Sequence, residues 1–151
     1  MIPPEVVVVG CAGVDTNVYL PPAGIDWGVE GNFTENLDCV GQAGGYASLG
    51  YAALGRRVAF IGHVGEDAAG RTVRETLQAA GIDLRGLGVD PAGTARSVNL
   101  MYPDGRRKNF YDGKGHPALD LDLPRCREVM SGARLAHVNI PDWARHLLPL
   151  A

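Results

Sequence analysis

The stretch EVVVVG, from Glu5 to Gly10, constrains the fold of this chain more than any other segment. Its four consecutive valines have β-branched side chains, which favour an extended backbone. An apolar run that is continuous rather than alternating predicts a strand buried on both faces, as in a parallel sheet. The run RRVAFIG, from Arg56 to Gly62, has the same character and predicts a second buried strand.

Helical segments alternate with these strands. Helices are predicted from about Gly45 to Leu54, from Asp67 to about Ala80 and from Pro124 to Ser131, with a last one starting at Pro141. In the second helix, Val73, Leu77 and Ala80 fall on one face, and Asp67 is a suitable N-cap. Short strands are expected in GIDLRGLGV and LAHVNI. This alternation predicts an α/β core around a parallel sheet.

Two insertions predict a small, more exposed β-sheet beside that core. The runs NVYL and NFTENLDCV are separated by a Pro/Gly-rich linker, and TARSVNLMYPDGRRKNFYDG places two extended runs around a Pro-Asp-Gly turn. Neither face of the latter's first run is wholly apolar, which fits a flap better than a central strand. The insertions are placed at about residues 16–40 and 95–112. The basic run GRRK is interpreted as a solvated hairpin tip.

Composition narrows the class of protein. The chain has 151 residues, enough for one domain with a core, and its 14 basic and 17 acidic residues give a net charge of -3. That balance argues against nucleic-acid binding, and no apolar run is long enough to cross a membrane. Cys11, Cys39 and Cys126 lie far apart without a CxxC pair, and the four histidines form no metal-binding pattern. A reduced, cytoplasmic setting fits best.

The stretch GQAGGYASLGYAALG, from Gly41 to Gly55, has three glycines in its first five residues, directly before a predicted helix. Glycine allows the backbone to approach a ligand closely, and a helix beginning near Gly45 would present free N–H groups to that ligand. The stretch therefore suggests a cradle for a polar small molecule. Tight packing of a helix on a strand explains the same glycines equally well.

Several short motifs follow one another in a fixed order along nearly the whole chain. They are Gly10 with Asp15 five residues later, the glycine-rich turn leading to Leu54-Gly55, VGEDAAG from Val64 to Gly70, Ala80-Gly81-Ile82, and Pro103-Asp104-Gly105. In this order the sequence resembles the PfkB/ribokinase family of carbohydrate kinases. Each motif is weak alone, and their order and spacing make the resemblance specific.

The resemblance implies an α/β fold with a Rossmann-like parallel-sheet core of ribokinase type, here incomplete, and a small β-sheet lid. Residues 1–151 would form the N-terminal part of that domain. The implied activity is ATP-dependent phosphorylation of a hydroxymethyl group of a sugar or nucleoside, under a lid that excludes water. The candidate substrate-binding residues are Asp15, Gly41, Gln42, Gly44, Gly45, Tyr46, Asn99 and Asn139. No catalytic or metal-binding residue is expected in this chain.

Some candidates have simpler interpretations. Asp15 could be a turn residue or a cap, although its neighbours favour hydrogen bonding to substrate hydroxyls, for which a carboxylate is well suited. A sugar contact and an ordinary role are equally supported for Asn139. For Ser97 and Asn99, a place on the flap surface is preferred.

The cradle departs from the family pattern at two positions. The family often has a Gly-Gly pair and then an Asn, where this chain has Gln42 and Tyr46. A tyrosine cannot reproduce the two-ended hydrogen bonding of an amide. We hypothesise that Tyr46 stacks on a sugar face or base, or that Gln42 supplies the missing amide.

The catalytic half that the resemblance implies is not recognised in these residues. Family members are about twice as long and carry a Gly-Ala-Gly-Asp-type turn, which is not found here, and no P-loop motif occurs. ATP and Mg²⁺ are expected for the full-length enzyme, and neither is expected to bind this chain alone, which should be inactive. The alternatives are a non-catalytic sugar- or nucleoside-binding remnant and one half of a split enzyme.

The expected partners follow from the incomplete core. They are a small-molecule sugar or nucleoside, the missing C-terminal half, and a second copy bound through the lid or an exposed sheet edge, which should make the isolated chain self-associate or dissolve poorly. A Rossmann dinucleotide-binding site at VVVVGCAGVD is disfavoured, because its spacing is G-x-x-G and an extended run follows.

Overall fold

The structure, a computed structural model, describes residues 2–115, 121–139 and 142–150. Its core is sheet A, four parallel strands in the order β5-β4-β1-β8. The strands are β1 (Val6–Val9), β4 (Val58–Val64), β5 (Asp83–Val89) and β8 (Leu135–Val138). The valine run forms a strand buried on both faces, as predicted, in which Val7, Val8 and Val9 are fully buried, and this strand is one of the two central ones.

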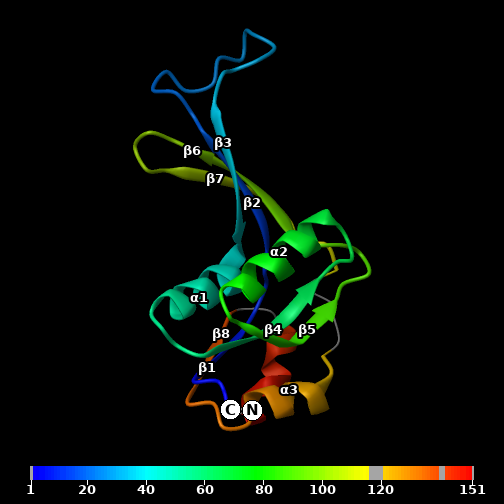
Figure 1. Cartoon of the computed structure of the whole chain (residues 1–151). Helices are drawn as coiled ribbons and strands as arrows, with labels where there is room; N and C mark the ends of the chain where they lie inside the picture. The colour runs from blue at the N-terminus through cyan, green and yellow to red at the C-terminus, as the bar shows by residue number, and fades with distance from the viewer. Residues whose placement is uncertain (1, 116–120, 140–141, 151) are drawn as a thin grey trace.

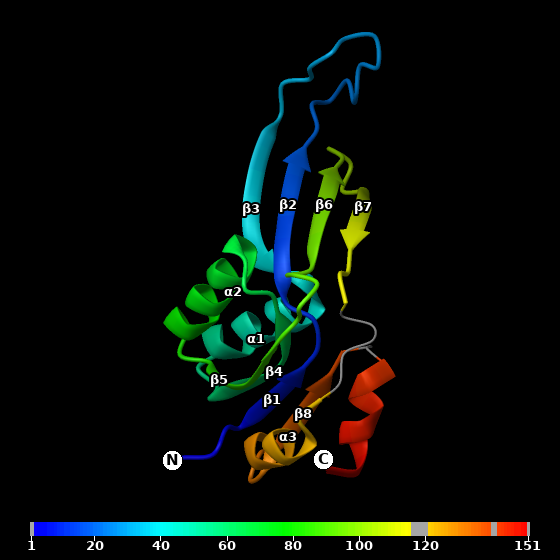
Figure 2. The ribbon, with the colours of Figure 1, turned by 90° about the vertical axis from the view of Figure 1, so that its right-hand side faces the viewer.

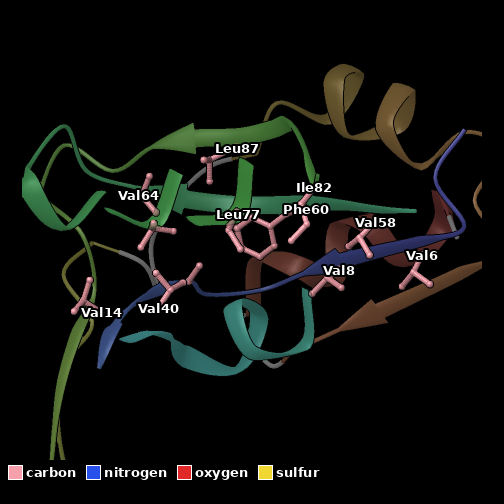
Figure 3. Close-up of a cluster of buried hydrophobic side chains, with 12 residues drawn as sticks. Val6, Val8, Val14, Val40, Val58, Phe60, Val64, Leu77, Ile82 and Leu87 are labelled. Carbon is pink, nitrogen blue, oxygen red and sulfur yellow. The ribbon is translucent and has the colours of Figure 1, made fainter. Parts of the chain in front are cut away.

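Helices cover both faces of sheet A, giving three layers (Figure 2). Val6 and Val8 pack in a cluster with α1 (Gln42–Ala53) and α2 (Ala68–Ala79). Val7 and Val9 point the other way, toward α3 (Leu123–Met130) and the 3₁₀ helix η2 (Asp142–Leu150). Figure 3 shows the first cluster, where Val8, Phe60 and Leu77 point into a common core. Continuous apolar strands are explained by this two-sided burial.

A second sheet, sheet B, projects from one end of sheet A as an arm (Figures 1 and 2). It contains β2 (Gly13–Tyr19), β3 (Glu35–Gly41), β6 (Arg96–Met101) and β7 (Arg107–Asp112) in the order β3-β2-β6-β7. β2 pairs with β6 in parallel, and the other two pairs are antiparallel. We call sheet B the lid. The predicted Pro-Asp-Gly turn joins β6 to β7, with Gly105 at φ +85°.

Several boundaries differ from the expected ones. Helix α1 begins at Gln42 rather than near Gly45, because the glycines lie inside its first turn. β2 begins at Gly13 and so includes Asp15. Ala80 is the exposed C-cap of α2 and not part of its buried face. The last helix is of the 3₁₀ type, and its predicted start, Pro141, lies outside the described residues.

Other expectations are met within the described residues. Asp67 caps α2, and Gly81 follows that helix with φ +73°. The three cysteines are free thiols. The segment after β1 is a strand and not a helix, which removes the dinucleotide-binding alternative. None of the helices in the described parts of the chain is long and apolar enough to cross a membrane.

Candidate functional site

Asp15 lies on β2, a few residues beyond the end of β1, and only 3% of the residue is exposed. One carboxylate oxygen, Oδ1, accepts short hydrogen bonds from Ser97 Oγ at 2.6 Å and from Gln42 Nε2 at 2.5 Å. The other, Oδ2, accepts a longer bond from the backbone N–H of Gln42 at 3.3 Å. A buried carboxylate needs such partners, because leaving it unpaired is costly. Strand β2, lid strand β6 and the start of α1 therefore meet at Asp15.

The backbone at the start of α1 is shaped around Asp15. A Cβ atom on Gly41 would overlap Asp15 Oδ2 and come within 2.9 Å of the Tyr46 ring. Gln42 has φ +62°, a left-handed conformation that is unfavourable for a residue with a side chain. In this conformation both its N–H and its side-chain amide reach Asp15. Gly41 and Gln42 together thus hold the carboxylate in place.

Gly44 and Gly45 have a different role in this structure. Their N–H groups both donate to the carbonyl of Cys11, at 2.8 and 3.2 Å, so these groups are not free as the sequence suggested. A Cβ on Gly44 would lie 2.7 Å from Cys11 O and 2.9 Å from the Phe60 ring. The packing interpretation of these two glycines describes what the structure shows.

The lid contributes a row of polar side chains beside Asp15. Asn99 is 1% exposed, and it donates to Asn17 Oδ1 at 3.0 Å and accepts from Asn109 Nδ2 at 2.8 Å. Ser97 is 4% exposed. The expectation that Ser97 and Asn99 lie on the flap surface is wrong, because the parallel pairing of β2 with β6 places Ser97 opposite Asp15 and Asn99 opposite Asn17.

Two tyrosines flank the carboxylate. The Tyr111 hydroxyl lies 3.5 Å from Cys11 Sγ, and the Tyr46 hydroxyl lies 3.5 Å from Cys39 Sγ. Loss of solvent raises the pKa of both phenols, and hydrogen bonding to the thiols raises it further. Burial likewise raises the pKa of the Cys11 thiol. These groups are therefore neutral at physiological pH and present aromatic surface and hydroxyl groups to the site.

A cavity of about 400 Å³ lies beside Asp15 and the two tyrosines, and its volume is within the range of small-molecule sites. It is lined by Asp15, Gln42, Ala43, Tyr46, Ser97, Arg107, Asn109 and Tyr111. The structure thus brings together Asp15, Gln42 and Tyr46 from the candidates, with Gly41 and Asn99 directly behind them. Sequence reasoning missed Ser97, Arg107, Asn109 and Tyr111. The β6–β7 turn was recognisable, and its antiparallel register, which pairs Ser97 with Tyr111, could have indicated them.

Asn139 is placed apart from that cavity, at the carboxyl end of β8. Its N–H donates to Val9 O at 2.8 Å, and its side chain lies against Gly10. Asn139 Oδ1 is 3.4 Å from His137 Nε2, and the Tyr51 hydroxyl is 3.1 Å from His137 Nδ1. The Asn139 Nδ2 atom is buried with no hydrogen-bond partner among the described residues. It is an available donor at the edge of the sheet where ligands of α/β proteins bind.

The groups around Asp15 support recognition of a hydroxyl-rich molecule, and Arg107 adds a positive charge to the cavity lining. Carboxylate, amide and hydroxyl groups offer both acceptors and donors, and the tyrosine rings offer apolar faces. Among residues 2–115, 121–139 and 142–150, no group of three acidic, histidine or cysteine side chains could hold a metal ion.

Known proteins of one family match this chain over most of its length. The profile of the pfkB family of carbohydrate kinases matches residues 5–131. An acarbose 7(IV)-phosphotransferase from Actinoplanes sp. is 36% identical over 136 residues, which are 90% of this chain and 45% of that protein. The chain spans about half the length of this relative.

Solved structures show the same relationship. A microbiome-derived acarbose kinase, Mak1, superposes with a TM-score of 0.86 at 33% identity, over 98% of this chain and 49% of its own. Ribokinase from Arabidopsis thaliana, complexed with ribose and ATP, gives a TM-score of 0.69 at 24% identity, over 91% of this chain and 45% of its own. The latter likeness concerns the fold alone.

Proposed function

Because this chain belongs to the pfkB family of carbohydrate kinases, we propose that it supplies the substrate-binding part of an ATP-dependent sugar or nucleoside kinase. The proposed reaction transfers the γ-phosphoryl group of ATP to a hydroxymethyl group. The observation that carries this proposal is the buried Asp15 carboxylate facing a polar cavity between the core and the lid.

Asp15 is proposed to accept hydrogen bonds from substrate hydroxyl groups. Its Oδ1 atom already takes the two short bonds from Ser97 and Gln42, whereas Oδ2 accepts the longer bond at 3.3 Å. An ionised carboxylate has about four lone-pair sites, so Oδ2 retains capacity for a substrate hydroxyl. Charge-assisted bonds of this kind are stronger than neutral ones and would orient the sugar.

The remaining cavity residues are proposed to select a hydroxyl-rich carbohydrate. Tyr46 and Tyr111 offer ring faces for stacking, and Gln42 supplies an amide in the cradle. Two relatives that are 33–36% identical act on acarbose by name. Acarbose is therefore the first probe to try, followed by fructose, ribose and adenosine.

Phosphoryl transfer is proposed to need a C-terminal half, which would hold ATP and Mg²⁺. The length of the relatives supports this, because they are about twice as long as this chain. The chain alone is expected to bind the sugar without consuming ATP.

Binding calorimetry with the four probes tests the proposed site. We expect Asp15→Asn to weaken the best probe by roughly tenfold or more, because the replacement keeps the volume and removes the charge. Asp38→Asn is the matched control, since this lid carboxylate is exposed and contacts Thr16 only at the surface. Equal affinity of Asp15→Asn and wild type, or no binding of any probe, would contradict the proposal.

Tyr46 is tested in the same way. Tyr46→Ala should weaken binding if the ring stacks on the substrate, and Tyr46→Phe should largely restore it. No effect of Tyr46→Ala would return this residue to a packing role.

The second candidate function is a non-catalytic sugar- or nucleoside-binding module. It is favoured by the match to only about half of each relative. Adding the C-terminal half of a relative discriminates the two. Restored ATP turnover supports the kinase half, whereas retained binding without turnover supports the module.

A further inference from the structure

The stretch VGEDAAG, from Val64 to Gly70, contributes no residue to the cavity, although its order of residues is part of the family resemblance. It joins the end of β4 to the start of α2. Asp67 is the N-cap of α2, and its Oδ1 atom accepts from Gly70 N at 2.7 Å. Capping accounts for one bond to this carboxylate. Its other hydrogen bonds are to Thr94.

Asp67 also binds Thr94, which lies two residues before β6. Asp67 Oδ2 accepts from the backbone N–H of Thr94 at 2.9 Å, and Oδ1 accepts from its hydroxyl at 2.7 Å. Thr94 Oγ1 in turn accepts from Gly65 N at 2.9 Å. Thr94 is fully buried and Asp67 is partly exposed, so these bonds are partly shielded from water. The segment before β6 is thus bound by three hydrogen bonds to the β4–α2 connection, two of them to Asp67 and one to Gly65.

The glycines of the stretch permit this close approach. A Cβ atom on Gly65 would lie 2.6 Å from Gly93 Cα and 2.7 Å from Thr94 N. A Cβ atom on Gly70 would overlap the Gly65 carbonyl and lie 2.8 Å from Thr94 Oγ1. Gly65, Asp67 and Gly70 therefore all serve the same contact with residues 93–94.

The fastened segment leads directly to the cavity. Ala95, the residue after Thr94, accepts a hydrogen bond from Val14 N at 3.2 Å. Two residues further on, Ser97 donates to Asp15 at 2.6 Å. Only Ala95 and Arg96 separate Thr94 from Ser97, so we expect a displacement of Thr94 to shift Ser97 as well.

We propose that the Asp67–Thr94 bridge anchors the lid to the core and sets the position of Ser97 against Asp15. Asp67 and Thr94 are positioning residues in this proposal, since neither touches the cavity. Its relevance to substrate binding rests on the proposed function of the cavity, whereas the anchoring itself does not.

The segment that leaves the lid is held at the same place. Asp90, which is buried, accepts from Ala92 N at 2.8 Å and from Gly115 N at 3.0 Å, so it joins the entering and leaving segments.

Bonds from the N–H and hydroxyl of Thr94 also lower the pKa of Asp67 to about 2. The carboxylate is therefore ionised at physiological pH, when its bonds to Thr94 are strongest.

The simpler alternative is that Asp67 only caps α2. Asp67→Ser separates the two roles, because serine is a good N-cap but cannot span to both groups of Thr94. Asp122→Ser is the matched control: Asp122 caps α3 by accepting from Arg125 N at 3.1 Å and no hydrogen bond to the lid is found for it among the described residues.

Hydrogen exchange of backbone amides in the full chain, without ligand, tests the anchor. We expect Asp67→Ser to lower protection in β6 and β7 by roughly tenfold or more relative to β1 and β4, and Asp122→Ser to leave the lid unchanged. The amide chemical shifts of Ser97 and Gln42 should move in Asp67→Ser only. Equal lid protection in the two variants, or unmoved shifts, would overturn the proposal.

Thr94 supplies the second arm of the experiment. Thr94→Val keeps the shape and removes the hydroxyl, so it should reproduce the lid effect, and Thr94→Ser should restore protection. Acarbose affinity is then measured in the same variants. Reduced lid protection with no acarbose binding even in wild type would refute the proposed function and leave the anchor standing. Full lid protection in Thr94→Val would refute the anchor whatever the affinity.

Discussion

Asp15 shows how much a single buried charge demands from its surroundings. Its partners come from positions 42 and 97, far from it in the chain, and one of them adopts a left-handed backbone to reach it. An unfavourable conformation of this kind persists where the surrounding structure requires it, and such positions cluster at functional sites. The hydrogen bonds that hold the Asp15 carboxylate in place are therefore kept at the cost of an unfavourable backbone conformation at Gln42.

Removing the hydroxyl of Ser97 should destabilise the chain. Ser97→Ala leaves the buried Asp15 without one of its two short hydrogen bonds, at a cost of about 1–3 kcal/mol in the free energy of unfolding. Urea denaturation measures this cost. Ser131→Ala, at the exposed C-terminal end of α3, is the control and should change stability by less than about 0.5 kcal/mol. Equal effects of the two changes would show that the Ser97 bond contributes nothing.

The lowered pKa of Asp67 predicts how the stability of the fold depends on pH in acid. Its pKa in the folded chain is about 2, below its ordinary value of 3.8, so its ionised form stabilises the fold above about pH 4. This contribution should be lost as the pH falls from 3.8 toward 2. We therefore expect the stability difference between wild type and Asp67→Asn to shrink across that window, as followed by circular dichroism during denaturant titrations. A difference that stays constant from pH 6 to pH 2 would contradict the lowered pKa.

Only part of the site could be predicted at this scale. Asp15, Gln42 and Tyr46 were recognisable because they lie in or near local motifs. Ser97 and Asn99 were placed on a surface because short polar residues in a flap are usually exposed. Their burial depends on the pairing of β2 with β6, which joins segments about 80 residues apart and leaves no local pattern.

At the scale of the element, α1 depends on its glycines for packing and not for helix formation. The helix is rich in alanine, a strong helix former, yet Gly44 and Gly45 lie in its first turn and are buried against residues 10–12, which join β1 to β2, with Phe60 of β4 beside Gly44 and Val40 of β3 beside Gly45. The sequence predicted this helix but placed its start three residues late. The N–H groups of its first turn are satisfied by the Cys11 carbonyl, which is a tertiary contact.

Two glycines of α1 should respond in opposite ways to alanine. Gly44→Ala places a Cβ atom 2.7 Å from Cys11 O, so overpacking should destabilise the fold by about 1–3 kcal/mol. Gly50→Ala meets nothing within 4 Å and should stabilise the helix by up to about 1 kcal/mol. Thermal unfolding of both variants checks the contrast. A stabilised Gly44→Ala would mean that α1 can move away from β1 without cost.

At the scale of the whole molecule, the α/β core was the most predictable feature. Continuous apolar strands and capped helices are local signals, and they specified the parallel sheet and its layers. The order β5-β4-β1-β8 and the projecting lid were not deducible, because strand order is decided by long-range packing. The family resemblance supplied what local patterns could not, namely that core and lid share one site.

The strand order leaves β8 at an edge of sheet A, paired only with β1 among the described residues. Leu135 on this strand is 48% exposed, next to unpaired backbone groups. The lid has a second apolar surface, where Val98 lies opposite Phe110, which is 56% exposed. Both surfaces could support the self-association expected from the sequence. An open strand edge offers hydrogen bonds as well as apolar area, so we expect it to dominate.

Sedimentation velocity of the isolated chain over a range of concentrations tests this ranking. Wild type should associate as the concentration rises, and Leu135→Lys should shift it toward monomer, because a charged lysine on an edge strand opposes pairing. Phe110→Lys should have a smaller effect, and Leu54→Lys, at the exposed end of α1, should have none. A larger effect of Phe110→Lys would assign the contact to the lid instead. A monomer with a sharp cooperative melt at high concentration would show that neither surface is adhesive, and that the open edge of β8 is tolerated without a partner.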